Sequence, residues 1–421
     1  MAEHTQPSCP GLTPATGPAE PPDRRAEAVL LRTVTGDPLA RAGISRTRLE
    51  VAEATIEQLR RRLDRVRWPE RETVADTAQG IPLDRVRRLI GYWRTGYDWR
   101  RFESLFNDLG HYRAVLDGLA IHFMHVRSPH PDATALLLTH GWPGSVVEFV
   151  RAIGPLTDPT AHGGDAQDAF HVIAPSMPGF GFSEKPTTTG WTATRIARAW
   201  AELMNLLGYQ RYLAQGGDWG GAVTHALAVL APEGLAGIHL NFPPFLFSPP
   251  LSTGDPGEPE RRALERLDTF RRVGAGYHRV QSTRPQTIGY GLTDSPAGLA
   301  AWIYEKFDEW TDTNHQPEQV LPLDLILDNI MLYWLPASAA SAARLYWQHE
   351  GLDMSRPPST LPVGISAFPA EIVPIPRVWA ERVYPRLVYF NTVERGGHFA
   401  AFEQPELFTR EVRAFSRQLP G

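Results

Sequence analysis

The stretch Gly216-Gly217-Asp218-Trp219-Gly220-Gly221 decides the interpretation of this chain. It follows Tyr212-Leu213-Ala214, a short apolar run typical of a buried strand, and it precedes a helical pattern over residues 222–230. Small residues two before and two after a central side chain allow the sharp strand-to-helix turn known as a nucleophile elbow. We therefore expect Asp218 to be displayed at such a turn. The same residues would also suit an ordinary glycine-rich turn in which Asp218 only caps the helix.

An aspartate at the centre of such a turn determines the chemistry. With an ordinary pKa of about 3.9, the side chain of Asp218 is already an anion at neutral pH and needs no base to attack a carbon atom. Attack on an sp³ carbon would leave an alkyl ester on the protein. Water must then hydrolyse that ester, and this second step is the one that needs a general base.

The general base is predicted near the end of the chain. His398 lies in Arg395-Gly396-Gly397-His398-Phe399, a glycine-flanked loop just past the strand-like residues 387–390. The chain has 14 histidines, so the position of His398 selects it rather than its residue type. Three others fall in a predicted hairpin and are expected to be surface or packing residues: His111, His122 and His125.

A carboxylate should orient the imidazole of His398 through its other ring nitrogen. Glu371 follows the strand-like residues 363–367, in a loop expected at the same edge of the sheet, and we favour it for this role. Glu394 and Glu403 are nearer to His398 in sequence, but they can equally be solvated surface acids.

The loop Thr139-His140-Gly141-Trp142-Pro143-Gly144-Ser145 is the candidate oxyanion site. It follows a strand-like run, so it can present a backbone N–H toward the elbow. The N–H groups of Trp142 and Trp219 could together hold the oxyanion that forms during ester hydrolysis. A plain strand-to-helix turn without a special role is the alternative.

Strands alternate with helices over much of the chain, which predicts an α/β fold with a mainly parallel sheet covered on both faces. Before them, the Asp117-Gly118 pair separates two alternating segments and predicts a β-hairpin. The short apolar runs are 135–138, 172–174, 212–214, 238–240, 363–367 and 387–390.

Five regions follow from these patterns. Residues 1–43 are rich in Pro, Gly and Ala and are predicted to be a disordered tail. Residues 44–110 show three helical stripes, beginning near residues 56, 83 and 99. The interval 243–360 has helical patterns and many aromatic residues but no convincing parallel strand, so it is predicted to be a cap domain. This cap divides an α/β core into two parts, 111–242 and 361–421.

The composition is that of an ordinary globular protein. The chain has 42 Lys and Arg against 47 Asp and Glu, a net charge of -5 that indicates no affinity for nucleic acid. Its one cysteine, Cys9, excludes a disulfide within the chain, and no ligand spacing favours a metal. We see no signal peptide and no apolar run long enough to span a membrane. We therefore expect a cytoplasmic location, without a membrane anchor, metal or cofactor.

The leaving group decides which reaction an aspartate nucleophile performs. An opening epoxide becomes an alkoxide and needs a neutral donor such as a tyrosine phenol, whereas a halide needs N–H donors. Tyr277 and Tyr346 stand out in the predicted cap. Spacing alone does not select them from the 12 tyrosines, most of which should be packing residues.

From about residue 44 to its end, the chain resembles the microsomal-type epoxide hydrolases of the α/β-hydrolase superfamily. The segments that match are Arg67-Trp68-Pro69-Glu70, His140 to Ser145, Gly217 to Gly221, Asp294 to Leu299, and Arg395 to Phe402. The resemblance implies a mainly parallel eight-stranded sheet, a helical cap inserted after strand 6, and a helical N-terminal region that wraps the core and contacts the cap. Membrane-bound members have an N-terminal anchor, where this chain has a polar, Pro-rich tail.

The resemblance also implies a role for each candidate residue. Asp218 would be the nucleophile, His398 the general base and Glu371 its acid partner. Tyr346 would donate the proton, and Tyr277 would bind the epoxide oxygen. The implied reaction converts an epoxide and water into a vicinal diol through a hydroxyalkyl ester of Asp218.

Two other functions stay open at this point. A haloalkane dehalogenase shares the fold and an aspartate nucleophile, but the two tyrosines argue against it. A catalytically silent α/β-hydrolase that binds a ligand or protein is the other alternative. The sequence does not identify the epoxide, the regiochemistry, or whether the role is detoxification or secondary metabolism. A homodimer is the assembly that we consider.

Overall fold

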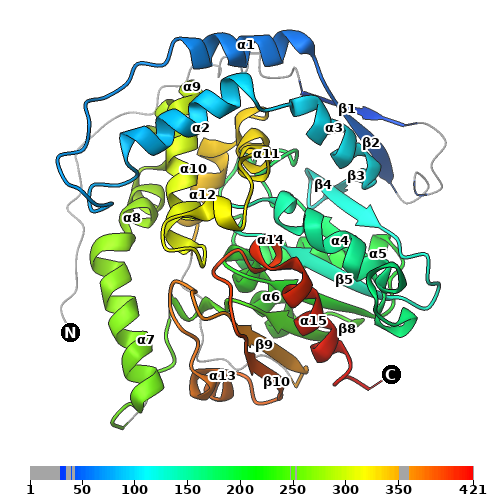
Figure 1. The fold of residues 1–421 in the computed structure, drawn as a ribbon. Helices are drawn as coiled ribbons and strands as arrows, with labels where there is room; N and C mark the ends of the chain where they lie inside the picture. The colour runs from blue at the N-terminus through cyan, green and yellow to red at the C-terminus, as the bar shows by residue number, and fades with distance from the viewer. Residues whose placement is uncertain are drawn as a thin grey trace, which may run out of the picture.

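A computed structural model shows one large sheet with helices on both faces and further helices above it (Figure 1). The structure describes residues 29–34, 39, 43–246, 248–251, 254–349 and 360–420. Most of the predicted disordered tail therefore lies outside the described residues.

Ten strands form a mixed sheet in the order β1-β2-β3-β4-β6-β5-β7-β8-β9-β10. Along this spatial order, neighbouring strands are antiparallel as far as β6. From β6 through β5 to β10, neighbouring strands are parallel. The strands are β1 (Val29–Thr33), β2 (Ile44–Val51), β3 (His111–Leu116), β4 (Leu119–Val126), β5 (Thr134–Thr139), β6 (Phe170–Pro175), β7 (Tyr212–Gly216), β8 (Leu235–Leu240), β9 (Val363–Ala367) and β10 (Leu387–Thr392).

The predicted eight-stranded sheet is confirmed as the part from β3 to β10. Five of the seven pairings among these strands are parallel, and every predicted apolar run lies in one of them. The central strands β6 and β7 are buried along their whole length, because helices cover both faces of the sheet.

The Asp117-Gly118 pair joins β3 and β4 as predicted. Both residues have positive φ angles, 46° and 77°, which a two-residue hairpin turn of the primed type requires. The histidines of this hairpin are buried packing residues and do not lie on the surface. His111 Nδ1 lies 2.9 Å from His122 Nε2, and His125 Nε2 lies 2.8 Å from the hydroxyl of Tyr209.

Helices on the two faces of the sheet follow the expected alternation. On one face α4 (Val150–Thr157) packs against α15 (Pro405–Ser416), and on the other α5 (Ala193–Leu206) packs against α6 (Trp219–Leu230) (Figure 1). Helix α6 is apolar on nearly all sides because it is buried against β5, β7 and β8. Two shorter helices, α13 (Arg377–Val383) and α14 (Ala400–Glu403), complete the core.

The N-terminal region contains the three predicted helices, but it also contributes two strands that the sequence analysis did not predict. The helices are α1 (Glu53–Asp64), α2 (Leu83–Thr95) and α3 (Trp99–Asp108). Strand β1 lies inside the range predicted as a disordered tail, and β2 begins the range predicted as helical. Strand β1 pairs antiparallel with β2, and β2 pairs antiparallel with β3, so the two strands extend the edge of the sheet. This pairing explains why apolar residues of β2 such as Ile44 and Leu49 are buried.

Among the described residues between β8 and β9 lie six longer helices, which form the predicted cap. Counted from β3, β8 is the sixth strand, so the insertion occurs where the resemblance placed it. The helices are α7 (Glu258–Thr269), α8 (Gly276–Thr283), α9 (Pro285–Asp294), α10 (Pro296–Trp310), α11 (Leu323–Trp334) and α12 (Ala339–Trp347). Within this interval, the part that the structure describes contains no strand.

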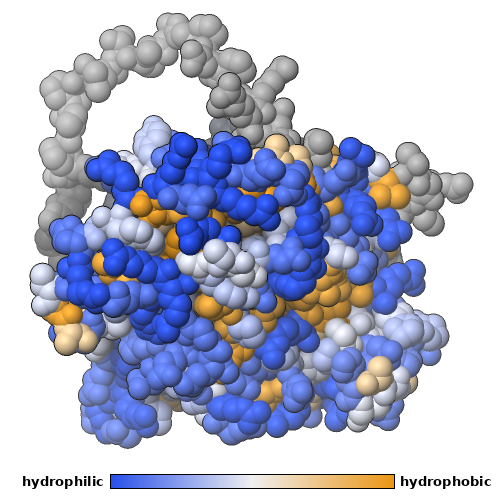
Figure 2. All heavy atoms as spheres, turned by 45° about the horizontal axis from the view of Figure 1, so that its top comes forward, coloured by the Kyte–Doolittle hydropathy of each residue, from blue (hydrophilic) through white to orange (hydrophobic). Residues whose placement is uncertain are grey.

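The N-terminal helices pack on the cap. Helix α2 contacts α10 and α11, and α1 contacts α10. Arg101 binds the buried carboxylate of Asp328 at 2.7 Å, and the hydroxyl of Tyr97 donates to the same carboxylate at 2.8 Å. The face that these helices turn outward is largely hydrophilic, with hydrophobic residues gathered in a few patches (Figure 2). No described helix is both long and apolar enough to cross a membrane.

Candidate active site

Asp218 stands at the turn between β7 and α6, with φ 52° and ψ -129°. The surrounding glycines are required because the backbone passes very close. A Cβ on Gly216 would lie 2.2 Å from the carbonyl oxygen of Gly220, and a Cβ on Gly220 would lie 1.9 Å from that of Thr139. The predicted nucleophile elbow is therefore present, at a strained backbone position of the kind found at functional sites.

The side chain of Asp218 is turned toward the oxyanion loop and makes no capping bond to its own helix. Its Oδ1 atom accepts a hydrogen bond from the backbone N–H of Trp142 at 2.8 Å. The alternative role as a simple helix cap therefore does not describe this residue. The Trp142 N–H therefore lies beside the carboxylate of Asp218, and the oxyanion-binding roles of the Trp142 and Trp219 N–H groups stay predictions.

His398 and Glu371 form the expected buried pair beside Asp218. The Nδ1 atom of His398 lies 2.6 Å from Glu371 Oε1, and its Nε2 atom lies 3.6 Å from Asp218 Oδ2. Burial opposes the charged imidazolium, but the negative charges of Glu371 and Asp218 outweigh this effect and raise the pKa of His398 well above its usual value.

Glu403 and Glu394, the two other acids considered as partners of His398, make contacts elsewhere. Glu403 is buried and accepts hydrogen bonds from the backbone N–H groups of Gly397 and Phe399, at 3.2 and 3.0 Å, so it holds the loop that carries the histidine. Burial raises the pKa of Glu403 to about 7. Glu394 lies on the surface and pairs with Arg410 at 3.0 Å.

Tyr277 and Tyr346 come from different cap helices, α8 and α12, and meet above the elbow. Their ring centroids are 5.9 Å apart, with Tyr277 stacked on the indole of Trp142 and Tyr346 edge-on to the indole of Trp219. Burial, together with the charge of Asp218, raises the pKa of each phenol well above its usual value, so both are protonated at neutral pH. The Tyr346 hydroxyl is buried without a hydrogen-bond partner among the described residues.

The structure thus brings all seven predicted site residues to one place. Asp218, the Trp142 loop, Glu371 and His398 follow β7, β5, β9 and β10, and the carboxyl ends of these parallel strands lie at the same edge of the sheet. The cap places the two phenols over that edge. No group of three or more potential metal ligands occurs among the residues that the structure describes.

Glu148 is a residue of this site that the sequence analysis missed. It lines a cavity of about 20 Å³ together with Asp218 and His398. Burial raises the pKa of Glu148 to about 8, and the charge of Asp218 acts in the same direction. The signal in the sequence was a single acid within the apolar run of residues 146–150, a position where a charge is costly unless it has a role.

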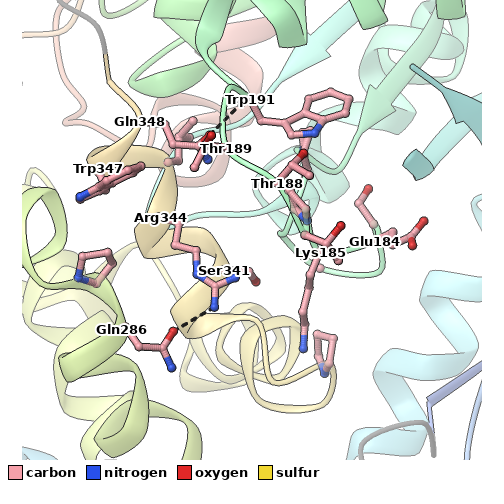
Figure 3. Close-up of a pocket in the computed structure, with 18 of the residues that line it drawn as sticks. Glu184, Lys185, Thr188, Thr189, Trp191, Gln286, Ser341, Arg344, Trp347 and Gln348 are labelled. Carbon is pink, nitrogen blue, oxygen red and sulfur yellow. Dashed lines mark hydrogen bonds between the residues drawn. The ribbon is translucent and has the colours of Figure 1, made fainter. Parts of the chain in front are cut away.

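A larger cavity, of about 1220 Å³, is lined in part by residues of α12, but Tyr346 is not among its lining residues. Lys185 and Arg344 both extend into it, and the guanidinium of Arg344 donates to Gln286 at 3.0 Å (Figure 3). Neither Asp218 nor His398 lines this crevice, so the larger cavity is not the place of the chemistry. The cavity beside Asp218 is much smaller, about 20 Å³.

Two family models match the chain. The epoxide hydrolase N terminus matches residues 44–149, and the alpha/beta hydrolase fold matches residues 134–275. A protein of Stigmatella aurantiaca that is provisionally named an epoxide hydrolase is 57% identical over 377 residues, 90% of this chain and 86% of that protein. Epoxide hydrolase 1 of Oryctolagus cuniculus is 36% identical, with 87% of each chain covered.

Solved structures agree with these matches. The juvenile hormone epoxide hydrolase of Bombyx mori superimposes with a TM-score of 0.76 at 29% identity, covering 94% of this chain and 96% of that one. The Aspergillus niger epoxide hydrolase gives a TM-score of 0.78 at 29% identity, covering 94% and 98%. With its elbow, its histidine–glutamate pair and its two cap tyrosines in place, this chain belongs to the microsomal-type epoxide hydrolase family.

Proposed function

We propose that this protein hydrolyses an epoxide to a vicinal diol, with Asp218 as the nucleophile. The observation that carries the proposal is that two protonated phenols, Tyr277 and Tyr346, lie together above the carboxylate of Asp218 at the nucleophile elbow. The phenols supply neutral donors for an oxygen leaving group, and Asp218 supplies an anion aimed at the carbon beside it.

In the first half-reaction, Oδ2 of Asp218 attacks one epoxide carbon and the bond from that carbon to the epoxide oxygen breaks. Tyr277 and Tyr346 hydrogen-bond the oxygen, and Tyr346 gives up its proton to it, leaving a phenolate. The Oδ1 atom stays on the Trp142 N–H and becomes the carbonyl oxygen of the new ester. A hydroxyalkyl ester of Asp218 results.

In the second half-reaction, His398 Nε2 takes a proton from water as the water oxygen attacks Cγ of Asp218. The oxyanion is held by the N–H groups of Trp142 and Trp219. When the intermediate collapses, the leaving alkoxide takes the proton from His398. The carboxylic acid of Asp218 then returns its proton to the phenolate of Tyr346, which restores every group.

Ester formation also prepares His398 for its role. The negative charge of Asp218 is one of the causes that raise the pKa of His398, and this charge disappears when Asp218 becomes an ester. The pKa of His398 therefore falls at the stage at which a neutral imidazole is needed, while Glu371 still holds the ring in place.

The proposal is tested with Asp218→Asn and His398→Gln, using styrene oxide as an aryl epoxide probe. Asp218→Asn should form neither ester nor diol. His398→Gln should form the ester and accumulate it, which intact mass spectrometry detects. A single turnover of the unmodified protein in H₂¹⁸O should place the label in Asp218 and not in the first diol released. Label in that first diol would show direct attack by water and contradict the covalent route.

A haloalkane dehalogenase is the other enzyme that this fold and nucleophile could support. The two phenols suit an oxygen leaving group better than a halide. Release of halide without formation of diol, measured side by side, would reverse this choice. The aromatic walls formed by Trp142, Trp310 and the two tyrosines favour epoxides with apolar substituents.

A further inference from the structure

The cavity beside Asp218 has the size and lining of a site for one water molecule. Its volume is about 20 Å³, and one water needs roughly 10–15 Å³ of such space. Two buried polar atoms on its lining residues, Thr139 Oγ1 and Gln215 Oε1, have no hydrogen-bond partner among the described residues. Buried polar atoms without partners are unusual in proteins, and an ordered water is their common partner.

The cavity lies on the core side of Asp218. Its lining includes Asp218, His398 and Glu148, but neither of the cap tyrosines. The epoxide must approach from the tyrosine side, because its oxygen has to reach the phenols. A water in the cavity would therefore face Asp218 from the other side and stay in place while the ester is formed.

The carboxyl of Glu148 occupies space that a glycine leaves open. A Cβ on Gly144 would lie 1.4 Å from Glu148 Oε1, so the absence of a side chain at residue 144 is what admits this carboxyl. The backbone of Gly141 lies beside the Glu148 carboxyl and favours its charged form, next to the Trp142 N–H that holds Asp218. Glu148 is thus fixed relative to the oxyanion loop.

We propose that this cavity holds the hydrolytic water and that Glu148 positions it, by accepting one of its hydrogen bonds, between His398 Nε2 and Cγ of Asp218. This inference rests on the proposed function, because it assigns a residue to the second half-reaction. Water held by Glu148 gives one proton to His398 and attacks the ester carbon, and Glu148 itself neither gains nor loses a proton. Glu148 is a positioning residue with no part in opening the epoxide.

The test measures ester formation and ester hydrolysis separately, by rapid quench and intact mass with styrene oxide. Glu148→Leu keeps the approximate volume and removes the acceptor, so hydrolysis should slow by roughly 100-fold while ester formation is unchanged. As a result, kcat and KM should fall together and the ester should accumulate at steady state. Glu148→Gln keeps an acceptor oxygen and should recover most of the rate.

A second variant displaces the carboxyl without removing it. In Gly144→Ala the new methyl group would occupy the position of Glu148 Oε1, so the flexible carboxyl must leave the cavity. The same selective loss of hydrolysis is expected. Glu233→Leu, a matched change at an exposed residue, should behave as the unmodified protein does.

The outcomes separate this inference from the proposed function. Ester hydrolysis at an unchanged rate in both Glu148→Leu and Gly144→Ala, or an equal loss of both steps, would overturn the role of Glu148. The proposed function would stand if His398→Gln still accumulated ester. If no variant and no quenched wild-type sample contained an ester, the covalent route itself would be wrong.

Discussion

Glu371→Gln isolates the charge of the acid partner from its geometry. Glu371 Oε1 accepts from the backbone N–H of Ile372 at 2.7 Å and lies 2.6 Å from His398 Nδ1. A glutamine must keep its oxygen at this position, because its NH₂ group cannot accept from Ile372. The substitution therefore removes the negative charge and leaves the imidazole in the same tautomer.

The size of the effect follows from burial. The His398 and Glu371 side chains are at most about 5% exposed, so their hydrogen bond lies near the upper value for a charged partner, roughly 3 kcal/mol. Loss of this charged bond should lower the pKa of His398 in the ester, because Glu371 is the largest of the charges that raise it. Hydrolysis should slow roughly 10- to 100-fold, according to how much imidazolium charge has developed in the transition state.

The pH profile provides the decisive measurement. Hydrolysis needs a neutral His398, so its rate rises with pH through the pKa of this residue and then levels off. In the unmodified protein Glu371 raises that pKa, and in Glu371→Gln the rise should move to lower pH. Decay of the ester would be followed by rapid quench and intact mass between about pH 5 and pH 9.

A matched control and a refuting result complete the design. Glu394→Gln removes an exposed acid that pairs with Arg410, and both rates should stay unchanged. A profile that does not move in Glu371→Gln, or an equal slowing of ester formation, would refute the assignment of Glu371 to the second step.

Three further predictions concern other parts of the molecule. Tyr346→Phe should slow ester formation by roughly 100-fold and leave ester hydrolysis unchanged in single-turnover experiments, because it removes a donor to the epoxide oxygen. Gly220→Ala should reduce stability by roughly 3 kcal/mol in urea denaturation, because its Cβ would lie 1.9 Å from the carbonyl oxygen of Thr139. Arg101→Met should lower the melting temperature at pH 7, and much of this loss should disappear near pH 5, because Asp328, left without its cation and with a pKa that burial raises to about 6, then binds a proton.

The sequence predicted those parts of the site that short-range constraints determine. Asp218 and His398 are each marked by glycines that the backbone needs at that point, and Glu371 follows a strand of clear pattern. These signals lie within a few residues of the side chain concerned. For that reason the residues alone were enough to place the elbow, the histidine loop and the core strands.

The sequence did not reveal features that depend on distant parts of the chain. Tyr277 and Tyr346 meet only because the cap folds back over the sheet, and their choice rested on the family resemblance. Strand β1 is stabilised by pairing with β2, so the composition of its neighbourhood misled the prediction of a tail. Glu148 reaches the site only because Gly144 leaves room for its carboxyl, and no local pattern encodes that fit. The cytoplasmic location and the homodimer stay predictions.

The contacts between the N-terminal helices and the cap affect how the buried site can open. Arg101 and Tyr97 bind Asp328, and Arg85 pairs with the equally buried Asp308, so the cap is fastened on the side away from the sheet. A hinged swing of the whole cap would separate these charges at a cost of roughly 3–5 kcal/mol, leaving the open form below about 1% of molecules. Small epoxides should therefore enter by local breathing of side chains and loops, with the cap remaining closed above them.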